Sequence, residues 1–375
     1  MHHHHEHFWW RFFPHKELDR IYVSVAFKSF AISLISLFVP VYLFTELNYT
    51  LTHTLLFFIY YSLAFMISSP VSAKYSARFG VKHSILMSVP LYLLFVLALY
   101  FLPLVKIPLF VPGCLIGFSM SFYWMGLHSV FYKASDHKHR GAEVGKRTSI
   151  SIFATMLGPL LGGVMIKYVG FQLVFILASI LLFSSAFFLF TSKERHIKYH
   201  FSLKKIFIRK HWENSVFFVS RGSRVMAVGV IWPLFIFSIL GDYFSLGIIG
   251  SVTAGVSAIL IWIIGDYSDH TNKRKIIRWS VGFESLSWFI RAMITTIYGV
   301  FGATIFGAVV HGVIESPMGA LEYDKIKNNM AYYFVSREVY ICLGRIILIG
   351  VVLLTDSLMG GMIFNGIISF AALLL

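Results

Sequence analysis

Residues that can carry charge or a proton lie inside long apolar runs of this sequence. They are Lys28, Arg221, Arg224, His311, Glu315 and Arg345. Ionisable side chains are costly inside a membrane, so each one is a functional candidate. His311 and Glu315 are spaced i,i+4 and therefore share one face of a helix. A buried carboxyl group at Glu315 can carry a coupling proton, and the imidazole of His311, with an ordinary pKa of about 6.5, can relay it.

The same positions also allow purely structural interpretations. Glu315 can form a static ion pair with Lys28 or Arg221 that holds helices together. Lys28 and Arg221 lie about eight residues, or roughly 12 Å, inside the predicted ends of their helices. Long basic side chains can reach the membrane interface over part of that distance. The sequence leaves these alternatives open.

The composition indicates a chain that lies in a membrane. Of its 375 residues, 57% are hydrophobic and 13% are charged, and the mean hydropathy is +0.75. Soluble domains carry about 25% charged residues. Intrinsic disorder is excluded by the same numbers. An outer-membrane barrel is excluded because the apolar runs are continuous rather than alternating.

Twelve apolar runs predict an all-α membrane protein with twelve spans, which is the number that roughly 20 residues per span allows. The runs lie approximately at 20–45, 52–73, 84–104, 108–132, 148–169, 171–191, 214–240, 244–264, 277–298, 300–320, 334–355 and 358–375. Basic and apolar residues alternate between the sixth and seventh runs, which predicts an amphipathic linker on the cytoplasmic surface. The predicted parts are a cytoplasmic tail 1–19, a six-helix bundle 20–191, the linker 192–213 and a second six-helix bundle 214–375.

The net charge of +15 reflects orientation in the membrane. If the N-terminus is cytoplasmic, the connections on the opposite side carry only two of the lysines and arginines, Lys106 and Lys167. Positive residues gather on the cytoplasmic side, so both termini are predicted to be cytoplasmic, in an inner or plasma membrane. No nucleic-acid partner is expected. The histidine-rich leader 1–7 has no apolar core of a signal peptide and fits either a tag remnant or a weak metal-binding tail.

The two halves of the chain repeat each other. A shift of about half the chain length aligns Pro40 with Pro233 and Lys28 with Arg221. Such an internal repeat predicts two tandem, pseudo-symmetric bundles. Parallel six-span halves are a transporter architecture.

Two connections and one helix carry motifs that resemble those of the major facilitator superfamily, over nearly the whole chain. The connection after the eighth predicted helix has the pattern G-x-x-x-D with basic residues, formed by Gly265, Asp269, Lys273 and Arg274. The matching connection after the second helix lacks the acidic residue but keeps Arg78, Gly80 and Lys82. The fifth predicted helix is similar to an antiporter motif of the family at Gly158, Pro159, Gly162 and Gly163.

The resemblance implies roles in gating for these motifs. Asp269, beside Lys273 and Arg274, is expected to pair across helix ends and hold the bundles together on the cytoplasmic side. Because position 77 is alanine, this latch is expected mainly in the C-terminal half. The glycines of the fifth helix allow close helix approach, and Pro159 bends the helix. Ordinary small-residue packing is the alternative.

The resemblance also implies that the first, fourth, seventh and tenth helices line a central pathway. Lys28 and Arg221 are then expected at similar depth on opposite sides, where they favour an anionic substrate. Trp124 is expected opposite Glu315, and Arg345 is expected at the cavity edge or beside Glu315. The predicted substrate-binding residues are Lys28, Tyr123, Trp124, His128, Arg221, Arg224, His311, Glu315 and Arg345. Glu284 and Arg291 are expected on the bundle exterior, as structural partners or headgroup contacts.

These expectations combine into a secondary transporter that works by alternating access. The favoured version is proton-coupled efflux of a small anionic or amphiphilic organic solute, with Glu315 and His311 in proton coupling. One alternative is uptake of an organic anion, and another is a non-transporting receptor or lipid scramblase on the same scaffold. No ATP-binding, hydrolase or metal-ligand motif is present, so an enzyme, a metal site and a cofactor are not expected. The predicted partners are the solute, protons and membrane lipids, and the chain is expected to be a monomer.

Overall fold

The computed structural model describes residues 17–134, 140–190, 212–326 and 330–374, and within them it forms helices and no strands. Nine of the described helical segments are long and apolar enough to cross a membrane. The more polar α12 and the shorter apolar helices α7 and α15 complete the twelve predicted spans. The all-α, twelve-helix expectation is therefore confirmed, and the helices mostly extend beyond the apolar runs.

The first six spans form the N-terminal half. Their elements are α1 (Glu17–Ser36), α2 (Val39–Val41), η2 (Tyr42–Glu46), α3 (Leu51–Phe79), α4 (Val81–Phe101), α5 (Phe110–Ala134), α6 (Arg140–Val169) and α7 (Phe171–Phe190). The connections are short, and that between α3 and α4 is the single residue Gly80 at φ 101°. Glycine suits this positive φ because it lacks a Cβ.

The last six spans form the C-terminal half. Their elements are α9 (Trp212–Met226), η4 (Ala227–Ile231), α10 (Trp232–Leu240), α11 (Tyr243–Asp269), α12 (Lys273–Ala292), α13 (Ile297–Asp324), α14 (Met330–Thr355), α15 (Leu358–Ile368) and η5 (Ser369–Leu374). Most of the predicted linker and tail lies outside the described residues. The last residues of the predicted tail, from Glu17, belong to α1. The last residues of the predicted linker, from Trp212, belong to α9.

The first and seventh spans are interrupted in a related way. Span one passes from α1 through α2, which contains Pro40, into the π-helical turn η2. Span seven passes from α9 through the π-helical turn η4 into α10, which contains Pro233. The repeated prolines thus occupy short helices next to a π turn in both halves, but the order of turn and proline is reversed. Such turns are frequent at functional sites.

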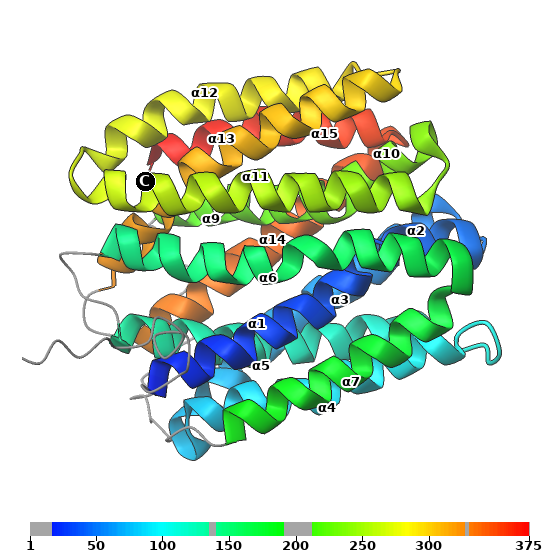
Figure 1. The fold of residues 1–375 in the computed structure, drawn as a ribbon. Coiled ribbons are helices and arrows are strands. Elements are labelled where there is room, and N and C mark those ends of the chain that lie inside the picture. The colour runs from blue at the N-terminus through cyan, green and yellow to red at the C-terminus, as the bar shows by residue number, and fades with distance from the viewer. Residues whose placement is uncertain (1–16, 135–139, 191–211, 327–329, 375) are drawn as a thin grey trace, which may run out of the picture.

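The two halves pack along two seams, one between α6 and α11 and one between α3 and α14. Figure 1 shows α6 and α11 as neighbouring, nearly parallel ribbons, with α14 passing between the halves. One end of the molecule, here called the Tyr243 end, holds the end of η2 and the start of α11. The opposite end, called the His128 end, holds the end of α5 and the start of α14.

Candidate functional site

A half-buried ion pair joins α9 to α13 in the C-terminal half. Arg221 donates from Nη1 to Glu315 Oε2 at 2.7 Å and from Nη2 to Oε1 at 2.9 Å. Arg224 Nη1 lies 3.7 Å from the same carboxylate. Two parallel bonds of this kind are strong and geometrically specific. Of the alternatives that the sequence left open for Glu315, the structure shows pairing with Arg221.

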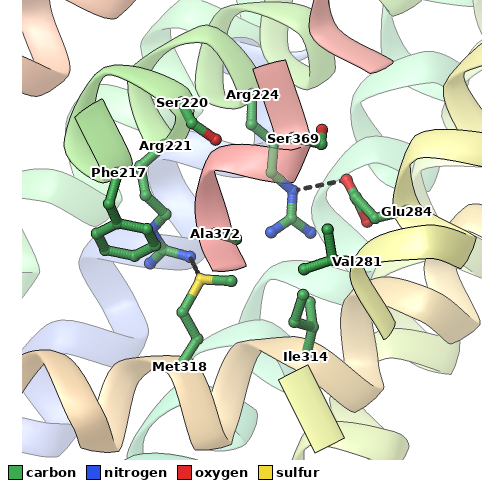
Figure 2. Close-up of a pocket in the computed structure, with 10 residues that line it drawn as sticks. All are labelled: Phe217, Ser220, Arg221, Arg224, Val281, Glu284, Ile314, Met318, Ser369 and Ala372. Atoms are coloured by element: carbon green, nitrogen blue, oxygen red, sulfur yellow. Dashed lines mark hydrogen bonds and ion pairs between the residues drawn. The ribbon is translucent and has the colours of Figure 1, made fainter. Parts of the chain in front are cut away.

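The network continues from Arg224 towards α12. Arg224 Nε lies 3.1 Å from Glu284 Oε1, and Trp288 Nε1 donates to the same oxygen at 2.9 Å. Arg224 also contacts His311 Nδ1, which lies 3.8 Å from Glu315. Figure 2 shows the ion pair of Arg224 with Glu284, and both residues line a cavity of about 20 Å³. That volume suits a single water molecule.

The expectation that Glu284 and Arg291 lie on the exterior is wrong. Glu284 and Arg291 are each 5% exposed, which rules out headgroup contact for both. Glu284 pairs with Arg224, and Arg291 lies over the rings of Trp232 and Trp288, at 5.0 and 4.3 Å from their centroids. The polar face of α12 therefore points into the bundle, which hydropathy alone does not reveal.

In the other direction the network runs to the His128 end. Arg221 Nε lies 3.1 Å from Glu322 Oε1, and Arg337 Nε lies 3.1 Å from Glu322 Oε2. Arg337 also contacts the adjacent Glu338. A continuous ladder of alternating charges thus connects Glu284 to Glu338 through α12, α9, α13 and α14. Glu322, Arg337 and Glu338 were not predicted as site residues because they lie at or beyond the ends of the predicted apolar runs 300–320 and 334–355, where charges are normally solvated.

His128 connects the N-terminal half to the end of this ladder. Its Nδ1 lies 2.7 Å from the Tyr323 hydroxyl, and its Nε2 lies 3.2 Å from Arg337 Nη1. Its ring is stacked between Trp124 and Phe334, at centroid distances of 5.3 and 5.1 Å. Trp124 therefore packs on His128. It does not lie opposite Glu315, which is where the repeat alignment placed it. These contacts close the two halves against each other at the His128 end.

Contacts between the halves also close the Tyr243 end. The Tyr243 hydroxyl bonds to Thr45 Oγ1 and Glu46 Oε1, both at 2.8 Å. Lys167 Nζ lies 3.3 Å from Asp242 Oδ1. With both ends in contact, the structure shows the halves in a closed arrangement.

Lys28 does not face the C-terminal half. It is 1% exposed, donates to Ser88 Oγ at 2.5 Å and lies 4.0 Å from the centroid of the Tyr123 ring. These contacts belong to α4 and α5 of its own half. The described contacts of Lys28 therefore lie within the N-terminal bundle, and its expected place at similar depth to Arg221, on the opposite side of a central pathway, stays a prediction. The interfacial interpretation is also wrong for Lys28.

Arg345 neither pairs with Glu315 nor reaches the ladder through a described ion pair. It is 4% exposed, and its guanidinium carbon lies 5.1 and 5.0 Å from the ring centroids of Tyr61 and Phe65 in α3. Its place is therefore the α3–α14 seam between the halves.

The motif of the fifth span lies where helices approach most closely. A Cβ at Gly158 or Gly162 would overlap α1, at Ser33 and Leu34 respectively. A Cβ at Gly163 would overlap the start of α11, at the Tyr243 carbonyl. The Pro159 carbonyl in turn faces Gly247 of α11. The motif thus provides close packing both within the N-terminal half and across the α6–α11 seam.

The connection motifs are placed at the His128 end. Asp269 pairs locally with Lys273 at 2.9 Å, one turn along the chain. In the same connection, Arg274 donates its backbone N–H to the helix-capping Asn272, and Gly265 is buried. In the other half Arg78 lies over Phe79, at 5.3 Å from its centroid, and Lys82 is the second residue of α4, after Gly80 and Val81. The predicted latch role of these residues remains a prediction.

Comparisons with known proteins agree with this architecture. A family model described as Major Facilitator Superfamily matches residues 21–349. A Bacillus subtilis protein, "Uncharacterized protein YqgE", is 24% identical over 268 residues, which are 66% of this chain and 61% of that protein. The chain therefore spans about three fifths of this relative's length.

Two solved structures share the fold at low sequence identity. A bacterial homologue of the iron transporter ferroportin, outward-facing with soaked iron, has a TM-score of 0.70 at 13% identity, covering 95% of this chain and 96% of its own. The human organic anion transporter MFSD10 (TETRAN) has a TM-score of 0.68 at 8% identity, covering 96% of this chain and 100% of its own. Within the described residues, no three His, Cys, Asp or Glu side chains are grouped to hold a metal ion.

Proposed function

Since this chain belongs to the Major Facilitator Superfamily, we propose that it is a secondary transporter rather than an enzyme. It moves a small anionic or amphiphilic organic solute across the membrane by alternating access, coupled to protons and running as efflux. The observation that carries this proposal is the half-buried Arg221–Glu315 ion pair, with His311 one turn away from Glu315. A carboxylate held in this way inside a membrane protein is a candidate for proton exchange.

The closed contacts at both ends supply the two-state element that alternating access needs. The contacts of Tyr243 at one end and of His128 at the other join separate bundles. If one set breaks while the other holds, the space between the halves opens to one side only. Rigid-body motion of two packed units is a recognised form of such transitions.

Coupling follows from competition for Arg221. When Glu315 is ionised, it occupies both terminal nitrogens of the Arg221 guanidinium. A proton on Glu315 removes the negative charge and leaves Arg221 with Glu322 alone. An anionic solute can then compete for the freed guanidinium nitrogens. Proton binding and solute binding are thereby linked through a shared basic partner, which is the requirement for coupled transport.

The charges of the described spans favour an anionic solute. Lys28 contacts the neutral groups Ser88 and Tyr123, and Arg345 contacts the rings of Tyr61 and Phe65. Cations that lack a carboxylate partner create a positive potential in a low-dielectric region. The structural neighbours carry cargoes of opposite charge, iron in one and organic anions in the other. The described cations support the second of these for this chain.

Flux in proteoliposomes tests the proposal. The full chain is reconstituted in vesicles loaded with radiolabelled benzenesulfonate, which stays anionic and does not cross as a neutral acid. Since a proton on Glu315 favours solute binding to Arg221, the proton and the solute leave together, and an acidic vesicle lumen is expected to accelerate release in the wild type. Glu315→Gln should abolish this acceleration but retain exchange of labelled for unlabelled probe. Glu322→Gln, the matched control, leaves the Arg221–Glu315 pair intact and should retain the acceleration.

The alternatives give different results in the same assay. An uptake symporter would show proton-driven accumulation instead of release. A receptor or lipid scramblase would show no saturable flux, and Glu315→Gln would leave its activity intact. Unchanged proton acceleration in Glu315→Gln would reject Glu315 as the coupling group.

A further inference from the structure

Arg345 is a buried cation with an unusual set of neighbours. It lies in α14, is 4% exposed, and its Nε and Nη1 make no hydrogen bond within the described part of the chain. A buried guanidinium normally binds a carboxylate or several acceptors, because an unsatisfied charge in a low-dielectric region is costly. Two open donors on one side chain therefore need an explanation.

Three other arginines of the C-terminal half have carboxylate partners. Arg221 binds Glu315 and Glu322, and Arg224 binds Glu284. Arg337 binds Glu322 and Glu338. Arg345 stands apart from this ladder, so its open donors do not reflect a shortage of carboxylates in this half.

The neighbours of Arg345 come from the other half of the molecule. The rings of Tyr61 and Phe65, spaced one turn apart on α3, cover the guanidinium at 5.1 and 5.0 Å. Their centroids are 6.2 Å apart. Cation–π contact stabilises a guanidinium partially but does not satisfy its N–H donors. Since α3 and α14 form one of the seams between the halves, separation of the halves removes this cover and exposes the open donors.

Arg291 provides a comparison within the same half. It too lies between aromatic rings, those of Trp232 and Trp288, and its Nε lacks a hydrogen-bond partner. All of its ring neighbours belong to the C-terminal half, and a Cβ at Gly307 would overlap its guanidinium. Arg291 is therefore enclosed by its own bundle, whereas Arg345 faces the boundary that alternating access opens.

We propose that Arg345, with Tyr61 and Phe65, forms the site that selects the transported solute, and that this solute is an organic carboxylate bearing a flat ring. The carboxylate accepts a hydrogen bond from one of the open guanidinium donors and balances the charge of the group. The ring packs against the aromatic pair on α3, in the offset or edge-on arrangements that aromatic rings adopt. This inference rests on the proposed transport function and names the chemical class of its solute.

Binding to the purified full-length chain tests the site with simple probes. Melting temperature is measured against benzoate, benzamide, benzylamine and acetate at neutral pH, since a ligand of the folded state raises it by mass action. Benzoate should give the largest rise, acetate a smaller one, and benzamide and benzylamine little or none. Equal rises for benzoate and benzamide, or no rise with benzoate, would overturn the assignment.

Substitutions locate the binding. Arg345→Gln should weaken benzoate binding at least about tenfold, the scale of a lost charged contact. Arg345→Lys keeps the charge but lacks the planar guanidinium, so its affinity for benzoate should lie between those of the wild type and Arg345→Gln. Arg291→Gln, the matched control, should bind benzoate like the wild type. Wild-type affinity in Arg345→Gln would overturn the proposal.

A further variant keeps the charge and guards against loss of folding at Arg345. Phe65→Leu removes one ring of the aromatic pair and should reduce the preference for benzoate over acetate. An unchanged preference would overturn the ring requirement.

The outcomes are separable from those of the proposed function. Glu315→Gln should lose proton-driven benzenesulfonate release while its melting temperature still rises with benzoate. If benzoate binding depends on Arg345 but no variant or wild type shows proton-driven release, the coupled-transport proposal fails alone. If release is proton-driven but benzoate binding ignores Arg345, the solute site fails alone.

Discussion

The N-terminal half and the C-terminal half bury polar groups in different ways. In the N-terminal half the buried polar side chains are mostly serines, and several donate to carbonyls one turn back in their own helix. Examples are Ser62 to Phe58, Ser69 to Phe65 and Ser129 to Met125. Such bonds satisfy the hydroxyl locally and leave few demands on neighbouring helices.

The C-terminal half instead buries charges that depend on partners from other helices. Its ladder from Glu284 to Glu338 crosses α12, α9, α13 and α14, and its ion pairs hold only while these helices keep their positions. Buried polar networks of this kind fix a unique arrangement when complete and are costly when broken. The two halves therefore share a fold but differ in how strongly electrostatics constrains them.

The largest expected effect comes from breaking the ladder. Glu284→Gln leaves Arg224 without its 3.1 Å carboxylate partner. Breaking a buried pair on one side typically costs about 3–5 kcal/mol. The melting temperature in detergent should fall markedly, and the double variant Glu284→Gln with Arg224→Gln should recover part of the loss. If the single variant melts like the wild type, the ladder does not stabilise this half.

The opposite effect on stability is expected when the buried charge of Lys28, in the N-terminal half, is removed. Lys28→Met removes an ammonium group whose described contacts are neutral, and it keeps a flexible apolar chain. Replacing buried charge by apolar groups is often neutral or stabilising by about 1–4 kcal/mol. An unchanged or higher melting temperature is expected. A clear decrease would show that Lys28 stabilises the bundle and would weaken the contrast between the halves.

Adding a Cβ at a tightly packed glycine should destabilise both halves alike. A Cβ at Gly117 would meet the Tyr61 carbonyl, and one at Gly344 would meet the Val219 carbonyl. Overpacking of this kind costs about 1–3 kcal/mol. Both glycine-to-alanine variants should lower the melting temperature by similar amounts. Gly350 lies on the same helix as Gly344 but has open space around it. Gly350→Ala therefore serves as the control and should leave the melting temperature unchanged.

The smallest effect is expected at the contact between the halves formed by Lys167 and Asp242. Burial alone raises the pKa of Asp242, but hydrogen bonds from the Ser245 N–H and hydroxyl, and the nearby Lys167, hold this pKa below its ordinary value of 3.8. A lowered carboxyl pKa contributes stability above the ordinary pKa and loses it as the pH falls through the lowered one.

Asp242→Asn should therefore change stability at neutral pH by less than about 1 kcal/mol, as for exposed ion pairs. The difference between variant and wild type should vanish only below about pH 4, where the wild-type carboxylate takes up its proton. Melting curves from pH 3 to 7 in steps would check this. A difference that already disappears between pH 5 and 6 would contradict the lowered pKa.

Features set by local sequence were predictable, and those set by helix rotation were not. The twelve spans follow from apolar run length, and the correspondence of Pro40 with Pro233 follows from the repeat. Which face of a helix points inward depends on packing against helices far away in the sequence. For that reason the inward position of Glu284 and the turn of Lys28 into its own bundle were missed.

The candidate site was predicted as a set of residues but not as an arrangement. Arg221, Arg224, His311 and Glu315 do come together, as their charges and spacing suggested. Glu322 and Arg337 were not singled out, because a charge near the end of an apolar run is ordinarily explained by solvent. In the structure the neighbouring half covers this region through His128, which contacts Tyr323 and Arg337.

The π-helical turns η2 and η4 have a mechanical consequence. Each contains one residue more than an α-helical turn needs, and neither can lose it without shifting the register of the span. Moving such a turn by one step along the helix rotates the residues it passes by about 100° and advances them by about 1.5 Å. Such a step re-aims the side chains that the turn passes in spans one and seven, while both ends of each span keep their helical register.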